Sequence, residues 1–222
     1  MTTQYYLQKK GKFNRLLLDW WRKNKRDFPW RQTDDPYSIL IAEMLLRKTT
    51  SKQVEKVYDK FIKKYPSYKK LSKAKKKDLV ELLRPLGIEY QRANLFINFG
   101  CAIEDLFDGR IPNSYLELRK LPGIGQYSAN AVLSLSSNQK APMLDTNFIR
   151  IMDRIFGIKS SKSRAHSDPQ IWQMAGRLIP DGYSRDFNLA VLDFGAIQCN
   201  ARNPDCSSCP FISFCRYCEK NE

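Results

Sequence analysis

Apolar residues recur every three or four positions along almost all of this 222-residue chain, which favours helices as its only regular structure. Phe13, Leu16, Leu17 and Trp20 form one such series. No segment alternates apolar and polar residues as a half-buried strand does, and no repeat of solenoid length is present. We therefore expect an all-α fold, with helices near 12–24, 37–46, 54–62, 79–83, 93–103, 114–119, 126–137, 146–156, 169–178 and 185–197.

The charge balance indicates a polyanionic partner. Lys and Arg number 38 against 23 Asp and Glu, a net charge of +15. Basic proteins gain affinity for nucleic acids because each neutralised phosphate releases counterions. The longest apolar run stops at Glu43, which excludes a membrane span of about 20 apolar residues. The N-terminus lacks a secretory apolar core, so we expect a cytoplasmic or nucleoid-associated protein.

Two glycines between predicted helices mark a tight hairpin, Leu121-Pro122-Gly123-Ile124-Gly125. Glycine adopts backbone conformations that other residues avoid. The hairpin would present N–H groups beside the start of the next helix, where the helix dipole favours an anion. A Gly-x-Gly alone is weak evidence, but the basic composition indicates that the anion is a DNA phosphate.

Five of the six cysteines crowd into the last 24 residues. Cys199, Cys206, Cys209 and Cys215 are separated by six, two and five residues. Four thiolates can hold zinc or an iron–sulfur cluster. Structural zinc usually takes two close pairs, and these four contain one, so the spacing favours a [4Fe–4S] cluster and keeps zinc as the alternative. Cys218 and the isolated Cys101 fall outside the four.

Two carboxylates are candidates for chemistry. Glu43 lies in an otherwise uncharged helical stretch, where desolvation would raise its pKa toward the range useful for proton transfer. Asp145 precedes Thr146 and Asn147 at the start of a predicted helix. Structural roles are open for both: an internal ion pair for Glu43 and a helix N-cap for Asp145.

With these motifs in this order, the chain resembles the helix-hairpin-helix DNA glycosylase superfamily, in the endonuclease III and MutY branch. The hairpin 121–125, the segment Leu144-Asp145-Thr146-Asn147 and the four cysteines carry the resemblance. It implies two helical lobes with DNA in the cleft between them. One is a six-helix lobe over 30–140, with the hairpin unit at 114–137. The other joins 1–29 to 141–222 and holds one [4Fe–4S] cluster in loop 199–215.

The resemblance also implies roles for individual residues. Members that cut the backbone carry Lys where this chain has Tyr127, and a phenol cannot form the Schiff base that an amine forms. We therefore expect a monofunctional enzyme with little or no lyase activity. Its catalytic residues would be Asp145, Glu43, Tyr127 and Asn147, and its DNA contacts Leu46, Arg47, Lys48, Gly123, Ile124, Gly125 and Gln126.

Two stretches separate the substrate classes. Leu46-Arg47-Lys48-Thr49-Thr50 and Phe187-Asn188-Leu189-Ala190 resemble thymine-DNA mismatch glycosylases, whereas adenine glycosylases carry glutamines there. An amide reads adenine through paired hydrogen bonds, which Leu189 cannot make. We expect Leu189 and Ser51 to set base specificity. Because the sequence ends at Glu222, we also expect no oxidised-guanine-sensing domain of the MutY kind.

The expected function follows from these residues. It is hydrolysis of the glycosidic bond of thymine, and of uracil, opposite guanine in mismatched double-stranded DNA, by a monomer. This reaction would start the repair of deaminated 5-methylcytosine and cytosine. The alternatives are an adenine glycosylase acting on G·A mispairs and a non-enzymatic iron–sulfur DNA-binding protein.

Overall fold

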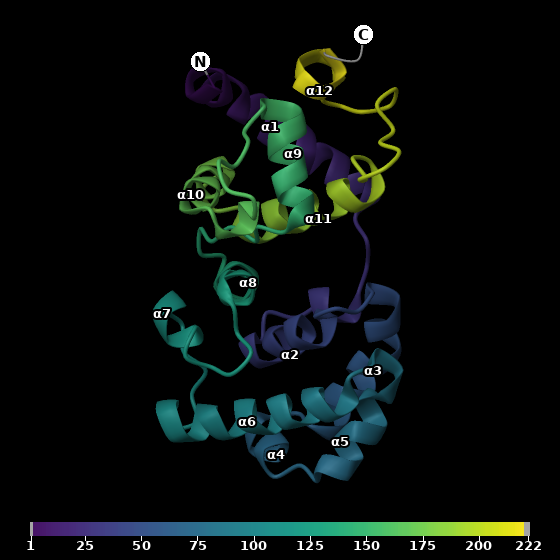
Figure 1. The fold of residues 1–222 in the computed structure, drawn as a ribbon, viewed down its shortest axis with the longest axis vertical. Helices are drawn as coiled ribbons and strands as arrows, with labels where there is room; N and C mark the ends of the chain where they lie inside the picture. Colours follow the sequence, from purple (N-terminus) through teal and green to yellow (C-terminus); the bar gives the residue numbers. More distant parts are fainter. Residues whose placement is uncertain (1, 220–222) are drawn as a thin grey trace. The chain divides into compact units, whose positions relative to one another are not determined.

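The computed structural model describes residues 2–219, and every regular element in that range is a helix (Figure 1). The described range contains no β-strand, so the predicted all-α class is confirmed. The chain divides into two compact units. Unit 1 comprises the described residues of Met1–Arg26 and Asn138–Glu222, and unit 2 comprises Asp27–Ser137.

Unit 2 is continuous in sequence and contains seven α-helices, where the resemblance implied six. The longest, α6, contacts α4 and α5, and α2 contacts α3 and α8 (Figure 1). The short α4 has a single buried residue, Leu71, too little for a periodic pattern to reveal. The helices are α2 (Pro36–Leu46), α3 (Ser51–Lys64), α4 (Tyr68–Ser72), α5 (Lys76–Leu83), α6 (Glu89–Phe107), α7 (Tyr115–Leu118) and α8 (Gln126–Ser137), with 3₁₀ turns η1 (Pro29–Arg31) and η2 (Arg84–Leu86).

Unit 1 is assembled from the two ends of the chain. Helix α11 contacts both α1 and α9, and the last helix, α12, contacts α9 (Figure 1). The helices are α1 (Thr2–Asn24), α9 (Thr146–Phe156), α10 (Pro169–Leu178), α11 (Ser184–Ile197) and α12 (Arg216–Glu219), with 3₁₀ turns η3 (Ala165–Ser167) and η4 (Ile212–Phe214).

Several helices begin at side chains that accept hydrogen bonds from the free N–H groups of the first turn. Asp35 accepts from Tyr37 and Ser38 ahead of Pro36, whose fixed φ suits the first helical position. At α3, Thr50 and Gln53 form a reciprocal capping box. The α9 helix ends at Gly157 with a φ of 68°, a left-handed conformation that ends a helix.

The core of unit 1 is rich in aromatic rings. Phe13 on α1 packs against Phe211 with the rings tilted and their centroids 4.9 Å apart, and it meets Phe156 on α9 edge to face at 5.0 Å. Tyr6 also contacts Phe156, at 5.7 Å. These contacts explain why α1 begins ten residues earlier than the helix predicted from residue 12.

The described chain has no helix that is both long and apolar enough to cross a membrane. Its long helices are amphipathic instead: α3, for example, buries Val54, Val57, Tyr58 and Phe61 on one face.

The short α12, like α4, was absent from the predicted set of helices.

Candidate active site

Asp145 stands at the N-terminus of α9, with both carboxylate oxygens held. Oδ1 accepts from the Phe148 N–H at 2.8 Å, and Oδ2 accepts from Asn147 Nδ2 at 2.7 Å. The helix-cap interpretation is thus correct, and it leaves room for a chemical role. Burial raises the pKa of Asp145, while hydrogen bonds from Phe148 and Asn147 and the Arg150 charge lower it. The Asp145 carboxylate is thus partly removed from water and is held by N–H groups that point at it.

Asn147 is in turn oriented by Arg150. Arg150 Nη2 donates to Asn147 Oδ1 at 2.7 Å, which fixes the amide so that its nitrogen faces Asp145. Gly195 on α11 permits this arrangement, because a Cβ at that position would lie 2.5 Å from Asn147 Cβ. The predicted pair Asp145 and Asn147 therefore forms one hydrogen-bonded group with Arg150, a residue that the sequence analysis did not identify.

Arg150 also joins this group to the cysteine segment. Its Nη2 donates to the Gly195 carbonyl at 2.7 Å and its Nε donates to the Cys199 carbonyl at 2.9 Å. Hydrogen bonds thus run from the Asp145 carboxylate, through two side chains, to the backbone of the first cysteine. In the sequence, the only indication of this role is that Arg150 is a charged residue among the apolar Phe148, Ile149 and Ile151.

The four predicted ligand cysteines and Cys218 line a single small cavity. Burial, and to a smaller extent the neighbouring Cys215, Cys199 and Cys206, raise the pKa of Cys209 to about 12, so these thiols lie close enough to interact. No three His, Cys, Asp or Glu side chains of the described chain form a group that could hold a metal ion. Three or more such side chains around one point would suit a single ion, with sulfurs about 2.3 Å from the metal. A cube of four irons and four sulfides holds its thiolates farther apart. Four cysteine thiols around one cavity are the kind of donor set that an iron–sulfur cluster takes.

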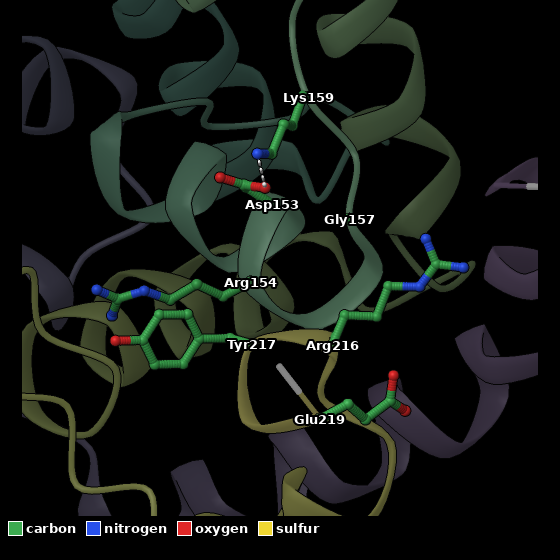
Figure 2. Close-up of a pocket in the computed structure, with 7 residues that line it drawn as sticks. All are labelled: Asp153, Arg154, Gly157, Lys159, Arg216, Tyr217 and Glu219. Atoms are coloured by element: carbon green, nitrogen blue, oxygen red, sulfur yellow. Dashed lines mark ion pairs between the residues drawn. The ribbon is translucent and has the colours of Figure 1, made fainter. Parts of the chain in front are cut away.

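Arg154 fixes the loop that carries these thiols. Its Nη1 donates to the Asn200 carbonyl at 2.7 Å and contacts Cys199 Sγ at 3.5 Å, and its Nη2 donates to the Ala201 carbonyl at 2.9 Å. The guanidinium also lies 4.7 Å from the ring centroid of Tyr217. Figure 2 shows these two side chains side by side among the residues that line a hollow, whose volume is about 620 Å³. This hollow lies at the C-terminal end of α9, whose other end carries Asp145.

In unit 2 the hairpin forms with the geometry that its sequence predicts. Gly123 has a φ of 81°, Ile124 N–H donates to the Leu121 carbonyl at 3.1 Å, and α8 begins at Gln126. Leu121 and Ile124 are buried, whereas Gly125 is exposed with nothing within 4 Å of a Cβ added to it. The hairpin is therefore anchored by its apolar residues and leaves its second glycine open to a ligand.

The loop after α2 lies beside the hairpin. Arg47 Nη1 donates to the Gly123 carbonyl at 3.3 Å, and Arg47 and Lys48 are both exposed. Lys48 has a positive φ of 53°, and Leu46 is half-buried. The structure thus brings two predicted DNA-contact segments together within unit 2.

A buried arginine, unnoticed in the sequence, holds this loop. Arg92 is 4% exposed and donates to the carbonyls of Gly87, Met44 and Arg47. Burial lowers its pKa below the usual value for arginine. It therefore ties the start of α6 to the end of α2.

Beside it, Ile88 has a φ of 47° and a half-exposed side chain. A β-branched residue in the left-handed region is strained by about 1–2 kcal/mol, and such strain concentrates at functional positions. Sequence reasoning missed Ile88, because an isolated isoleucine gives no sign of its backbone angles.

The remaining predicted residues are divided between the units. Glu43 is 8% exposed on α2, Tyr127 is half-buried on α8, and Ser51 and Gln126 each begin a helix of unit 2. Leu189 is 5% exposed on α11 of unit 1. Their roles stay predictions.

Comparison with known proteins agrees with these features. The model of the family "HhH-GPD superfamily base excision DNA repair protein" matches residues 41–176. A thymine-DNA glycosylase of Aeropyrum pernix is 44% identical over 91% of this chain and 92% of its own length. A thymine/uracil-DNA glycosylase of Pyrobaculum aerophilum is 39% identical over 95% and 94%. The solved structure of a thermostable thymine-DNA glycosylase superimposes with a TM-score of 0.92 at 38% identity, covering 96% of this chain and 98% of that one. From the hairpin, the capped aspartate and these matches together, the chain belongs to the HhH-GPD superfamily of base excision DNA repair proteins.

Proposed function

We propose that this protein is a DNA glycosylase that hydrolyses the N-glycosidic bond of thymine or uracil opposite guanine, and so starts base excision repair. Relatives with these activities in their names are 44% and 39% identical over nearly the whole chain. The observation in the structure that carries the proposal is the half-buried Asp145 carboxylate, which is held by Asn147 Nδ2 and the Phe148 N–H. A fixed anion of this kind suits a reaction that develops positive charge on a sugar.

The carboxylate acts mainly in the transition state. As the bond from the sugar carbon to the base breaks, the base departs with the electron pair and the sugar becomes an oxocarbenium-like cation. Asp145, held beforehand by its hydrogen bonds, stabilises a charge that is absent from the bound substrate. A water then attacks the sugar carbon, and the proton that it loses neutralises the departed base anion. Asp145, or Glu43 through a water, directs that nucleophile.

Tyr127 accounts for the expected absence of strand cleavage. A lyase needs an amine that attacks the sugar and forms a Schiff base, and the phenol of Tyr127 cannot do so. In this proposal Tyr127 packs against the extruded nucleotide and positions it. The product is therefore an intact strand with an abasic site.

DNA is held by the hairpin and by the loop that Arg47 joins to it. The open backbone at Gly125, with Gln126, faces a phosphate, and the cationic Arg47 and Lys48 add phosphate contacts. Leu46 or Arg47 occupies the space left by the extruded nucleotide, a step that is a few kcal/mol easier at a mispair. The exposed Ile88, tied to this loop through Arg92, supplies a second apolar side chain for contact with bases.

Leu189 and Ser51 select the base in this proposal. Leu189 has no amide with which to pair an adenine edge, and its apolar side chain tolerates the methyl group of thymine. These two residues therefore exclude adenine more strongly than they distinguish thymine from uracil.

We further propose that Cys199, Cys206, Cys209 and Cys215 hold one [4Fe–4S] cluster. The support is the shared cavity that these thiols line and the Arg154 hydrogen bonds that fix the first of their loops. When bound, the cluster supplies four iron–thiolate bonds, which join α11 to the C-terminal segment. The protein's own contribution is to bring the thiols together, with Cys199 and Cys215 buried in the core of unit 1.

A single assay tests the activity. Duplexes with a central G·T, G·U, G·A or oxidised-G·A pair are incubated with enzyme and resolved with and without alkali. We expect breaks at T and U after alkali only, and an intact strand without it. Excision of A alone would favour the adenine alternative, and tight binding without turnover would favour the non-enzymatic one. Sedimentation with and without DNA tests the expected monomer.

A further inference from the structure

The cysteine cavity is lined by one more thiol than a [4Fe–4S] cluster needs. Cys218 lies on α12, three residues after Cys215, and its N–H donates to the Cys215 carbonyl at 3.0 Å. Its thiol lines the same cavity as the four predicted ligands and is in contact with the thiols of Cys206 and Cys215. Cys218 also repeats, relative to Cys215, the two-residue spacing that joins Cys206 to Cys209. Four thiols belong to the proposed cluster, and the fifth touches two of them.

The two thiols that Cys218 touches differ in how firmly they are held. Cys215 is 6% exposed, and its Sγ donates to the Arg154 carbonyl at 3.4 Å, so α9 fixes its position. Cys206 is half-exposed and lies in a turn between the exposed Asp205 and Ser207. Of the two ligands that Cys218 touches, Cys206 is therefore the more exposed.

We propose that Cys218 is a reserve ligand, which binds the cluster iron of Cys206 when the Cys206 thiolate is lost. The inference rests on the proposed cluster. A peroxide first oxidises the Cys206 sulfur to a sulfenate and is itself reduced. A ligand exchange follows: the Cys218 sulfur forms a bond to iron, the bond from iron to the oxidised Cys206 breaks, and the Cys218 proton passes to the departing sulfenate.

The exchange has a chemical use. Exposed thiolates are the ones that oxidants attack, and an oxidised cysteine no longer binds iron as a thiolate. Without a replacement, the exposed iron would lack its thiolate and the cluster would be open to loss. A fifth thiol already in contact keeps four thiolates at the cluster, and so preserves the link between α11 and the C-terminal segment.

The test compares alanine variants of the full-length holoprotein, since alanine cannot bind iron. Iron and acid-labile sulfide per chain are measured for wild type, Cys206→Ala, Cys218→Ala and the double variant. We expect about four irons in wild type and in both single variants, and at most half of that in the double variant. Cys199→Ala is the matched control: its ligand lies 8% exposed after α11, and we expect loss of iron although Cys218 is present.

Alkylation provides an independent measurement. In wild-type holoprotein the free Cys218 thiol should react with iodoacetamide, as detected by mass spectrometry, and in Cys206→Ala the iron should protect it.

Loss of iron from Cys206→Ala with Cys218 intact would overturn the proposal, as would equal iron in the Cys206→Ala single and double variants. A wild-type protein without iron would instead refute the cluster itself.

Discussion

At the scale of single residues, the proposed site depends on a carboxylate that caps a helix. Asp145 caps α9 through the Phe148 N–H and is half-buried, and its pKa is raised by the loss of contact with water. The structure shows the cap, and the proposed function adds a chemical role to the same side chain. A substitution can separate them when it keeps the shape and removes the charge.

Asp145→Asn keeps an oxygen that can accept from the Phe148 N–H, and it removes the negative charge. We expect base excision to fall by about a hundredfold or more, because charge stabilisation in the transition state is lost. G·T binding and the thermal midpoint should stay close to wild type. Single-turnover kinetics measure the loss, with Asp153→Asn on the same helix as control. Activity within tenfold of wild type would leave Asp145 as a cap only.

We expect the charge of Arg150 to affect the pH dependence of the reaction. Its positive charge lowers the pKa of Asp145, which burial raises. Because the anionic form is the active one, removing that charge raises the pKa and moves the acid limb of the rate profile to higher pH. We expect this shift in Arg150→Gln, whereas Arg150→Lys should keep the limb near its wild-type position. A uniform decrease at every pH in Arg150→Gln would contradict the charge effect and indicate a purely structural residue.

At the scale of helices, close approach between elements positions the reacting groups. The crossing of α9 and α11 at Gly195 sets the position of Asn147, and the loop after α2 meets the hairpin through Arg47. The contact at Gly195 involves the base of the Asn147 side chain, whereas Arg47 reaches the hairpin with the end of a flexible side chain. A small change of volume at Gly195 should therefore have a large effect.

Gly195→Ala places a methyl group 2.5 Å from Asn147 Cβ, an atom that cannot rotate away. We expect the two helices to separate, with a cost of about 1–3 kcal/mol in stability and a slower excision step. Thermal unfolding and single-turnover rates measure both effects. In the control, Gly176→Ala, the added methyl group meets only Pro142 at 3.9 Å, so that variant should be neutral or slightly more stable.

The hairpin glycines can be separated in the same way. Gly125→Val adds its side chain in open space, so we expect unchanged stability and weaker binding to every duplex, because the phosphate approach is blocked. Gly123→Val adds strain at a φ of 81° and should lower stability as well. DNA binding measured by fluorescence anisotropy, together with thermal unfolding, tests these expectations for both variants. A Gly125→Val protein that bound matched DNA normally and lost only mismatch preference would refute the phosphate role.

At the scale of the whole molecule, net charge and helical pattern were readable from the sequence and close contacts were not. The all-α class and the family followed from periodicity and from the hairpin, aspartate and cysteine motifs. The roles of Arg92 and Arg150 did not, because their hydrogen bonds go to carbonyls far away in sequence. Cys218 was set apart for a similar reason: spacing does not reveal which thiols a chain brings together.

The net charge of +15 leads to a prediction about affinity. Each phosphate contact should contribute about 0.9 to the slope of log K against log salt. Arg47→Gln should reduce that slope by about one contact, equally for G·T and matched G·C duplexes, since phosphate contacts carry no sequence information. Titrations over a range of salt concentrations measure the slopes. An effect confined to the G·T duplex would mean that Arg47 reads bases.

The discontinuity of unit 1 has a consequence for the order in which a ribosome delivers the chain. Helix α1 is made before unit 2, whereas its partner rings Phe156 and Phe211 are made after it. Between them all of unit 2 leaves the exit tunnel as one uninterrupted segment. The apolar face of α1 therefore stays unburied while unit 2 is synthesised, and a chain cut short before α9 would be released without the rings that cover its first helix.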